Sequence, residues 1–364
     1  MAKLIKVGII GCGGIATKKH MPALKKVPDC EMVAFCDIIP ERAQNSAKTF
    51  GTPDATWCTD YKELLANPDI DVVHICTPNR SHSFITVDAL EAGKHVMCEK
   101  PMAINTAEAK KMLDAQKRTG KKLTIGYQSR FRDDAQYMKA EADAGTFGEI
   151  YYAKATALRR RAVPTWGVFL NEYEQGGGPL IDIGTHALDL TLWMMNNYKP
   201  KYCLGTTYHK LNKDTNQGNA WGNWNPDEFT VEDSAFGFVV MENGATIVLE
   251  SAWALNTLDV REAVTTICGT LAGADMHNGG LRINGIKNNR QYVFEPNFKV
   301  GGAAFNDGKG GATSAEVEER LWIEAVRNDT DPITLPEQAF VVTRILEGIY
   351  ESAKTGTIYT FNND

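Results

Sequence analysis

The chain has 364 residues and a formal net charge of −6, with 39 Lys and Arg against 45 Asp and Glu. This length is too great for one ordinary domain and fits two. The mild acidity argues against nucleic acid or an anionic membrane surface as a standing partner. No apolar run reaches the roughly 20 residues that span a bilayer.

The eight cysteines stand singly along the chain, with no C-x-x-C pair and no Cys/His cluster. A disulfide framework and a structural zinc site need such pairs or clusters, so neither is expected. The segment from Met1 to Lys6 and the short apolar stretch after it lack a signal-peptide cleavage pattern. We expect a cytoplasmic protein without a bound metal.

Short apolar runs alternate with amphipathic segments over the first third of the chain. Such runs, separated by helices of about ten residues, indicate a parallel sheet that is covered on both faces. We predict a doubly wound α/β domain of the Rossmann dinucleotide-binding type over residues 1–126. The strands are expected at Leu4–Ile10, Glu31–Cys36, Val72–Cys76, His95–Cys98 and Lys122–Gly126, and the helices at Ile15–Val27, Pro40–Phe50, Tyr61–Ala66, Ser81–Ala92 and Thr106–Thr119.

From residue 127 on, strand-like segments follow one another, joined by turns such as Glu242-Asn243-Gly244, which is typical of antiparallel sheets. We predict an α+β domain over residues 127–364 with a large, predominantly antiparallel sheet. A second subunit is expected to cover its open face, and a C-terminal helix has room to pack back on the first domain. The strands are expected at Gly148–Arg160, Lys201–Lys210, Thr230–Met241, Ala245–Leu255 and Val260–Gly269, the helices at Asp133–Ala144, Ile181–Met195, Ala315–Arg327 and Glu337–Lys354, and a surface loop at Asn212–Asp227.

A loop with the pattern G-x-G-x-x-A, from Gly11 to Ala16, follows the first strand and opens the first helix. Gly11 permits a tight turn, Gly13 lets the backbone approach a pyrophosphate, and the small Ala16 allows close packing of helix on strand. Phosphates would bind the unpaired amides at the helix N-terminus. We expect Gly11, Gly13, Gly14 and Ile15 to contact a dinucleotide.

Asp37 stands at the end of the second strand, 21 positions after Ala16. A carboxylate there accepts hydrogen bonds from the ribose hydroxyls and repels a 2′-phosphate. Ile38 and Ile39 offer no cation for such a phosphate, although Arg42 is near in sequence. The pattern favours NAD over NADP, with Asp37 and Arg42 as cofactor contacts.

Thr77, Pro78 and Asn79 follow the strand Val72–Cys76 at the carboxyl edge of the sheet, where open α/β sheets bind their ligands. We expect these three residues to line the cofactor. His82 at the next helix start has two interpretations that stay open, a surface position at a helix terminus and a cofactor contact.

Glu99-Lys100-Pro101 closes the strand His95–Cys98 at the same edge. Pro101 cannot continue a strand ladder and favours an extended Lys100, so the ammonium is presented by a fixed backbone and suits proton transfer. The alternative is a solvated lysine at a strand end. We expect Glu99 and Lys100 to contact the cofactor.

A glycine-rich turn, Gly176 to Gly178, leads into an apolar helical run. If the helix starts near Ile181, then Asp182 and His186 lie at i and i+4 on one face. A carboxylate beside an imidazole can orient the ring and stabilise its charged form. The alternative is a buried Asp–His pair that holds the helix to the sheet.

Together these motifs resemble the glucose–fructose oxidoreductase / inositol dehydrogenase / rhizopine catabolism (Gfo/Idh/MocA) family along nearly the whole chain. The Glu-Lys-Pro motif followed by Asp182-x-Gly-x-His186 is specific, whereas the glycine loop is widespread. The resemblance implies NAD(P)-dependent oxidation or reduction of a secondary alcohol on a sugar, cyclitol or polyol. It also implies that Lys100, Asp182 and His186 are the catalytic residues and contact the substrate.

Two more segments are similar to family segments. Tyr127-Gln128 looks like the segment that reaches the nicotinamide, which implies that Gln128 contacts the cofactor and Tyr127 the substrate. The run from Arg159 to Arg161, followed by Trp166, looks like a stretch of sugar-acting members, which implies that Arg159, Arg161 and Trp166 bind the substrate. For the arginines, a solvated strand, a salt-bridge network between subunits and an anionic substrate stay open.

The resulting hypothesis is an NAD-dependent oxidoreductase of a secondary ring hydroxyl in a sugar or glycoside, with C3 of a glucoside as its most specific form. Lys100 and His186 supply the acid–base chemistry, and either can be the base. Inositol dehydrogenase is one alternative. An NAD-dependent glycosidase that works by oxidation and elimination is a second, and a non-catalytic NAD sensor a third.

Overall fold

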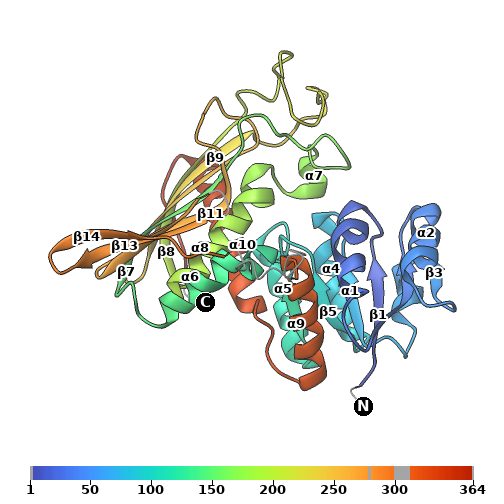
Figure 1. Cartoon of the computed structure of the whole chain (residues 1–364). Helices are drawn as coiled ribbons and strands as arrows, with labels where there is room; N and C mark the ends of the chain where they lie inside the picture. The colour runs from blue at the N-terminus through green and yellow to red at the C-terminus, as the bar shows by residue number, and fades with distance from the viewer. Residues whose placement is uncertain (1–2, 278–279, 299–311, 363–364) are drawn as a thin grey trace, which may run out of the picture. The chain divides into compact units, whose positions relative to one another are not determined.

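The computed structural model describes residues 3–277, 280–298 and 312–362. The chain divides into two compact units (Figure 1). The first unit consists of residues 1–131 and 311–340, and the second of residues 132–310 and 341–364. Segments that are far apart in the sequence therefore build each unit together.

Six parallel strands form the sheet of the first unit, in the order β3-β2-β1-β4-β5-β6. This is the Rossmann order, in which the ligand crevice lies where the strand order reverses, between β1 and β4. Strand β4 (Val72–Ile75) is buried at every position, as expected for a strand covered on both faces. The other strands are β1 (Ile5–Ile10), β2 (Cys30–Cys36), β3 (Thr56–Cys58), β5 (His95–Cys98) and β6 (Leu123–Ile125).

Helices connect these strands, and capping side chains fix where several of them begin. The Asn105 side chain accepts a hydrogen bond from the amide of Glu108 at the start of α5, and Thr313 and Glu316 form a capping box at the start of α9. The helices are η1 (Ala16–His20, a wide π-type turn), α1 (Met21–Leu24), α2 (Pro40–Phe50), α3 (Tyr61–Leu65), α4 (Asn79–Glu91), α5 (Thr106–Thr119), η2 (Gln128–Phe131) and α9 (Ser314–Asn328).

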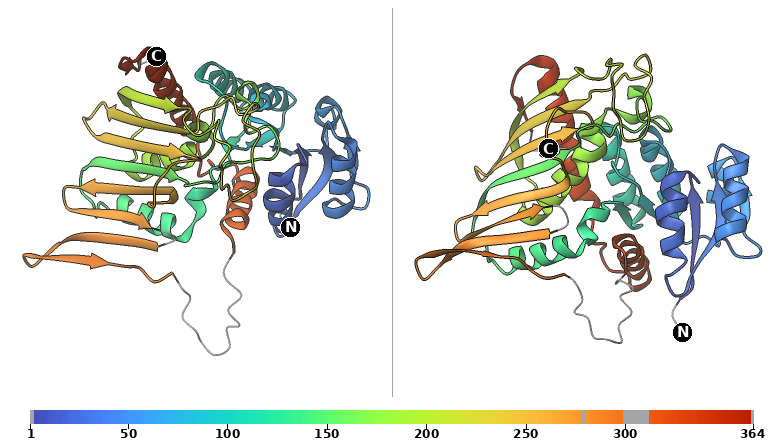
Figure 2. Two further views of the ribbon diagram at one scale, coloured as in Figure 1. Left: turned by 90° about the horizontal axis from the view of Figure 1, so that it is seen from above. Right: turned by 45° about the horizontal axis from the view of Figure 1, so that its top comes forward.

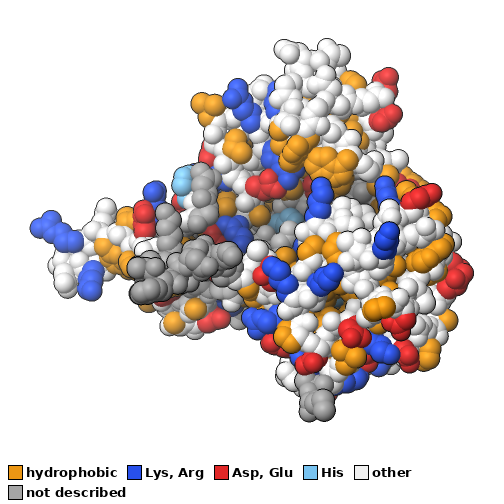
Figure 3. All heavy atoms as spheres, turned by 45° about the vertical axis from the view of Figure 1, so that its right-hand side comes forward, with side chains coloured by type: hydrophobic (Ala, Val, Ile, Leu, Met, Phe, Trp, Pro, Cys, Tyr) orange, Lys and Arg blue, Asp and Glu red, His pale blue; other side chains and the backbone are white. Residues whose placement is uncertain are grey.

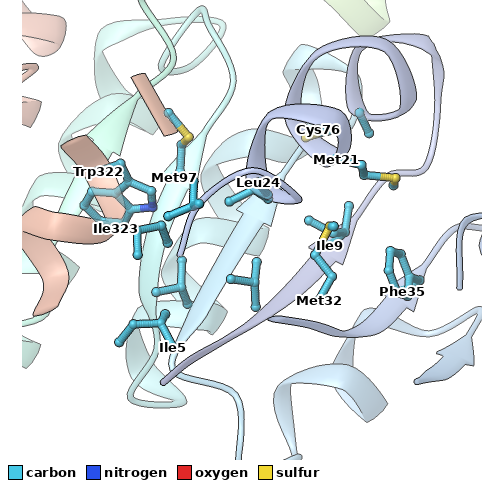
Figure 4. Packing of buried hydrophobic residues seen from close by; sticks show 14 of the residues in the cluster. Ile5, Ile9, Met21, Leu24, Met32, Phe35, Cys76, Met97, Trp322 and Ile323 are labelled. Carbon is cyan, nitrogen blue, oxygen red and sulfur yellow. The ribbon is translucent and has the colours of Figure 1, made fainter. Parts of the chain in front are cut away.

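Helix α9 is part of the core of the first unit (Figure 4). Its Trp322 and Ile323 are 3% and 0% exposed and belong to the same apolar cluster as Leu24 of α1 and Met97 of β5. Full burial of such side chains stabilises a fold by roughly 1.5–3 kcal/mol each. The late segment therefore contributes substantially to the stability of the dinucleotide-binding unit.

Nine strands form the sheet of the second unit, in the order β14-β13-β12-β11-β7-β10-β9-β8-β15 (Figure 2). The pair β7 and β10 is parallel, and the other neighbouring pairs are antiparallel. The strands are β7 (Ile150–Leu158), β8 (Pro200–Tyr208), β9 (Ser234–Met241), β10 (Thr246–Ala252), β11 (Arg261–Gly269), β12 (Ala272–His277), β13 (Gly280–Lys287), β14 (Arg290–Phe294) and β15 (Tyr359–Thr360).

Helices α8 and α10 cover parts of this sheet. Helix α8 contacts β7 and β11. Ile349 of α10 lies so close to the strands that a Cβ on Gly205 or Gly237 would be 2.6 or 2.5 Å from its side chain, so the glycines permit this contact. The helices are α6 (Asp133–Asp143), α7 (Glu172–Gln175), η3 (Leu180–Gly184), α8 (Thr185–Met195) and α10 (Pro336–Thr355), which begins in the first unit.

The predicted fold class is confirmed, with a parallel Rossmann sheet followed by a mostly antiparallel sheet. The expected strands and helices occur with small shifts of their ends. Strands β3 and β12 to β15 and helix α7 were not predicted. The expected loop at Asn212–Asp227 contains neither helix nor strand, but its Trp224 is only 3% exposed and anchors it.

Charged side chains of both signs are interspersed over the face in Figure 3. In the part of the chain that the structure describes, no helix has the length and apolar character needed to cross a membrane.

Candidate active site

The glycine-rich loop after β1 has the geometry that a pyrophosphate needs. Gly11 has a φ of +90°, and a Cβ there would lie 2.7 Å from the carbonyl carbon of Cys76, so the turn requires glycine. No atom lies within 4 Å of a Cβ built on Gly13 or Gly14, which leaves this side of the loop open to a ligand. Ala16 is fully buried, as close packing of helix on strand requires. The loop therefore fits a dinucleotide.

Asp37 lies beside this loop. Its Oδ2 accepts a hydrogen bond from the amide of Cys12 at 2.8 Å, and its Oδ1 accepts one from the amide of Ile39 at 2.9 Å. Each carboxylate oxygen keeps a further lone pair for a ribose hydroxyl. Ile15 is 41% exposed next to the loop, and Arg42 is exposed on α2.

A buried histidine joins two loops at the carboxyl edge of the sheet. His82 Nδ1 lies 2.7 Å from the carbonyl oxygen of Pro101, and its Nε2 lies 2.9 Å from the carbonyl oxygen of Thr77. The side chain is 1% exposed, and burial lowers the pKa of His82. His82 thus links the loop of Thr77, Pro78 and Asn79 to the loop after Lys100, so its position is not at the surface.

Glu99 holds the backbone of the expected catalytic lysine. Its Oε2 accepts a hydrogen bond from the amide of Lys100 at 3.0 Å. Its Oε1 contacts Lys19 Nζ at 2.8 Å and His20 Nε2 at 2.7 Å. Burial alone would raise the pKa of Glu99, but Lys19 and His20 hold it well below its usual range. The Glu99 side chain is therefore ionised and is held in place at the carboxyl end of β5.

This anion belongs to a buried charged cluster that sequence reasoning missed. Lys19 Nζ lies 3.0 Å from Glu318 Oε2, and His20 Nδ1 lies 2.5 Å from Glu319 Oε1. His74 Nε2 lies 3.6 Å from Glu319 Oε2. The one signal in the sequence is that Glu318 and Glu319 share a face of α9 with Trp322 and Ile323, at helical spacing.

Among the three carboxylates of this cluster (Glu99, Glu318 and Glu319), Glu318 is the one whose pKa is raised. Burial raises the pKa of Glu318 to about 7, against the opposing charge of Lys19. The donor atoms of His20, His74 and Glu319 lie within 4.8 Å of one another, as residues of a metal site do. However, both nitrogens of His20 already contact carboxylates, so the geometry is that of a hydrogen-bonded network.

Asp182 and His186 lie where a wide π-type turn, η3, runs into α8. The sequence predicted a regular helix from Ile181, so the i,i+4 spacing is met in a wider turn than expected. Both side chains are 8% exposed, and Trp253 Nε1 donates a hydrogen bond to Asp182 Oδ2 at 3.0 Å. Because Trp253 is fully buried, it fixes this carboxylate.

A second buried carboxylate, Glu232, holds the start of this helix. It accepts hydrogen bonds from the amides of Gly178 and Leu180 at 2.8 and 3.1 Å and from the Tyr350 hydroxyl at 2.8 Å. Burial raises the pKa of Glu232 to about 7. A Cβ on Gly178 would lie 2.3 Å from the Glu232 carbonyl oxygen, so this contact requires glycine. No local sequence pattern around Glu232 indicates this contact.

The predicted substrate arginines make local contacts. Arg159 forms a two-point ion pair with Glu262, at 2.6 and 2.5 Å, and its guanidinium lies 5.1 Å from the ring centre of Trp221. Arg161 donates to Asn256 Oδ1 at 2.8 Å. Arg159 therefore has an ion-pair partner within its own chain, and its predicted contact with the substrate stays a prediction.

The other predicted site residues differ in exposure. Trp166 is 52% exposed, whereas Tyr127 is fully buried. Gln128 Oε1 accepts a hydrogen bond from Lys19 Nζ at 3.2 Å. The predicted cofactor residues all lie in the first unit, with Lys100 and Tyr127, whereas Asp182, His186 and the Arg/Trp segment lie in the second.

A Rossmann sheet with an open glycine loop, followed by a unit built on a large sheet, defines a two-unit dinucleotide-binding protein. Comparison with known proteins agrees. Residues 5–127 match the oxidoreductase family with an NAD-binding Rossmann fold, and residues 135–274 match the GFO/IDH/MocA C-terminal domain. The chain belongs to the Gfo/Idh/MocA family, and the predicted family membership is confirmed.

Several relatives and solved structures resemble the chain. D-glucoside 3-dehydrogenase of Escherichia coli (strain K12) is 35% identical over 353 residues, which cover 97% of this chain and 96% of that protein. Inositol 2-dehydrogenase of Salmonella typhimurium is 30% identical over 197 residues, 54% of this chain and 56% of that protein. A structure of levoglucosan dehydrogenase with NADH and levoglucosan has a TM-score of 0.83 and 22% identity, and covers 98% of this chain and 99% of its own. It shows the shared fold.

Proposed function

We propose that this chain is an NAD-dependent dehydrogenase that oxidises a secondary ring hydroxyl of a glucoside, with C3 as the reacting carbon. The observation that carries the proposal is the 35% identity to D-glucoside 3-dehydrogenase over nearly the whole of both chains. The glycine loop and Asp37 would hold a nicotinamide cofactor, which would supply the hydride-accepting chemistry when bound.

In this proposal, side chains of the protein remove the proton of the reacting hydroxyl and stabilise the charge that develops on its oxygen. His186 takes the proton of the reacting hydroxyl, and Asp182, held by Trp253, orients its ring. Lys100 donates a hydrogen bond to the same oxygen and stabilises the charge that develops on it. The bond from its amide to Glu99 supports a fixed position of Lys100.

The preference for NAD over NADP rests on Asp37. Its carboxylate is held beside the glycine loop by the amides of Cys12 and Ile39. A ribose 2′-phosphate would bring a second anion toward it, and the neighbouring Ile38 is apolar and 87% exposed. We therefore assign NAD.

The test is an absorbance assay for NADH with purified protein and NAD⁺, against glucosides, free hexoses and inositols. Aryl glucosides in the panel also report release of their aglycone. NADH formed fastest with glucosides is the expected result. Aglycone release without NADH would instead establish the oxidation–elimination glycosidase, and no reaction with any compound would contradict the proposal.

A second candidate is an inositol dehydrogenase, favoured by the 30% identity to inositol 2-dehydrogenase over about half of the chain. Both reactions remove a hydride from a ring carbon that carries a hydroxyl, so the same residues serve both. In the same assay, kcat/KM for myo-inositol above that for every glucoside would select this candidate.

We also infer a homo-oligomer that forms through the large sheet, in the cytoplasm. Leu204 and Phe238, each 46% exposed, are paired neighbours on β8 and β9, and Phe238 is paired with Val248 of β10. Such an apolar row favours cover by a second subunit. All eight cysteines are free, which fits a reducing compartment.

A further inference from the structure

Two tryptophan rings in the second unit are largely exposed although they contact each other. Trp166 is 52% exposed and Trp221 is 43% exposed. Their ring centres lie 5.0 Å apart at an angle of 73°, an edge-to-face arrangement. Exposed apolar surface of this kind is costly in water and marks binding sites.

The backbone segments that carry the two rings are tied together. The Thr165 hydroxyl donates to the carbonyl oxygen of Trp221 at 2.7 Å. The Asn219 side chain accepts from the amide of Val163 at 2.8 Å and donates to the carbonyl oxygen of Val163 at 3.0 Å. These hydrogen bonds hold the two segments together, so the positions of Trp166 and Trp221 are set by the backbone as well as by the contact between their rings.

The pair is continuous with the proposed catalytic carboxylate. Phe169 lies 5.9 Å from Trp166 and 6.4 Å from Trp253, measured between ring centres. Trp253 in turn donates its hydrogen bond to Asp182. An unbroken row of aromatic rings thus runs within one unit from Asp182 to the exposed Trp221.

Polar groups border the exposed end of this row. The Arg159 guanidinium faces the ring of Trp221, and its two-point ion pair holds the partly exposed Glu262 carboxylate beside it. A flat apolar face with a hydrogen-bond acceptor at its rim suits a pyranose, which presents C–H groups on one face and hydroxyls at its edge. An aromatic aglycone would use the flat face and leave the rim unused.

We propose that Trp166 and Trp221 form a subsite for a second sugar ring, the one joined through the glycosidic bond to the ring that is oxidised. The inference rests on the proposed function for the orientation of the substrate. It narrows the substrate class from simple glucosides to glycosides with a sugar on both sides of the bond.

The experiment compares kcat/KM for three substrates: methyl β-glucoside, a β-linked glucose disaccharide and an aryl glucoside. Trp221→Ala is expected to lower kcat/KM for the disaccharide about tenfold and to leave methyl β-glucoside within about twofold. Trp221→Phe, which keeps a ring, should restore most of the loss. Trp57→Ala, at an exposed tryptophan on β3 of the first unit, is the matched control. It should leave kcat/KM for the disaccharide and for methyl β-glucoside unchanged.

Binding is measured separately by isothermal titration of each protein with the disaccharide. Weaker binding of the disaccharide to Trp221→Ala than to the wild type supports the subsite, even if neither protein turns over any substrate. Absence of turnover would overturn only the proposed function. Equal losses for the disaccharide and methyl β-glucoside, or no loss for either, would overturn the subsite. A loss confined to the aryl glucoside would overturn the sugar assignment in favour of an aromatic aglycone.

Discussion

Two lysines near the same sheet edge have opposite environments. Lys19 is enclosed by the carboxylates of Glu99 and Glu318, at 2.8 and 3.0 Å, which satisfy its charge inside the protein. Lys100 is only partly buried, and its amide donates a hydrogen bond to Glu99 at 3.0 Å. The enclosed position of Lys19 suits a structural role, and the catalytic role of Lys100 stays a prediction.

Replacing the catalytic candidate is the most direct test at this scale. Lys100→Met should lower kcat by roughly 10²-fold or more and leave NAD⁺ affinity largely unchanged, because the lysine acts on the reacting oxygen. Initial rates and calorimetric titration with NAD⁺ measure both quantities. Lys110→Met, at an exposed lysine paired with Asp114, is the control. Unchanged turnover in Lys100→Met would contradict the assignment.

Glu318 gives a pH-dependent prediction. Its pKa in the folded state is raised to about 7 by burial, so the folded protein binds this proton more tightly than the unfolded chain. This contribution to stability is complete below the ordinary pKa of a glutamate and is lost as the pH rises through about 7.

Glu318→Gln should therefore show a smaller decrease in the free energy of unfolding between pH 5 and 8 than the wild type, by about 1–3 kcal/mol. Urea denaturation at several pH values measures this slope. Glu316→Gln on the same helix, where the carboxylate pairs with Lys26 near the surface, should leave the slope as it is. Parallel curves for wild type and Glu318→Gln would refute the role of this proton.

Parts of the site whose conformation depends on residues close together in the sequence could be predicted from the sequence. The glycine loop is one such part, because its conformation is set within a few residues. The charged cluster could not be predicted, since His20 and Glu319 meet across 299 positions of the chain. Nothing local in either segment specifies such a contact.

Among the elements, the start of the Asp182 helix depends on a residue from elsewhere in the second unit. Glu232 lies two positions before the start of β9. Its carboxylate accepts hydrogen bonds from the amides of Gly178 and Leu180. Unpaired amides at a helix start favour a negative partner. The carboxylate thus sets where the helix begins and, through it, where Asp182 lies.

Tyr350→Phe tests this anchor with little change of shape. Loss of the hydroxyl removes one hydrogen bond to buried Glu232 and should cost about 1–2 kcal/mol of stability. The melting temperature should fall, and kcat should fall further than KM changes because the helix start carries Asp182. Tyr151→Phe, at a 54% exposed tyrosine, is the control. A melting temperature equal to that of the wild type would show that the anchor does not depend on Tyr350.

The elements that the sequence predicted are those with a buried apolar pattern. Strand β4 is buried throughout and was expected, whereas β3 is exposed at two of its three positions and β14 at all five. Exposed strands are held by pairing with a neighbour, and pairing leaves no periodic apolar signal in the strand itself. For this reason β3 and β14 escaped prediction.

At the scale of the whole molecule, the open face of the large sheet predicts the assembly. Phe238→Glu places a charge in the row of Leu204, Phe238 and Val248 and should dissociate the oligomer into monomers. Light scattering coupled to size-exclusion chromatography gives the mass of each form. Leu258→Glu, at an 88% exposed position, should leave the mass unchanged. A monomeric wild type would contradict assembly through this face.

The contribution of α9 to the first unit has a consequence for synthesis on the ribosome. The Rossmann sheet emerges early, but Glu318, Glu319 and Trp322 emerge only after the strands of the second unit up to β14 have been made. Until then Lys19 and His20 lack their carboxylate partners on α9. The nascent dinucleotide-binding unit is therefore incomplete through most of translation, which exposes its apolar surface to chaperones and delays cofactor capture until the chain is nearly finished.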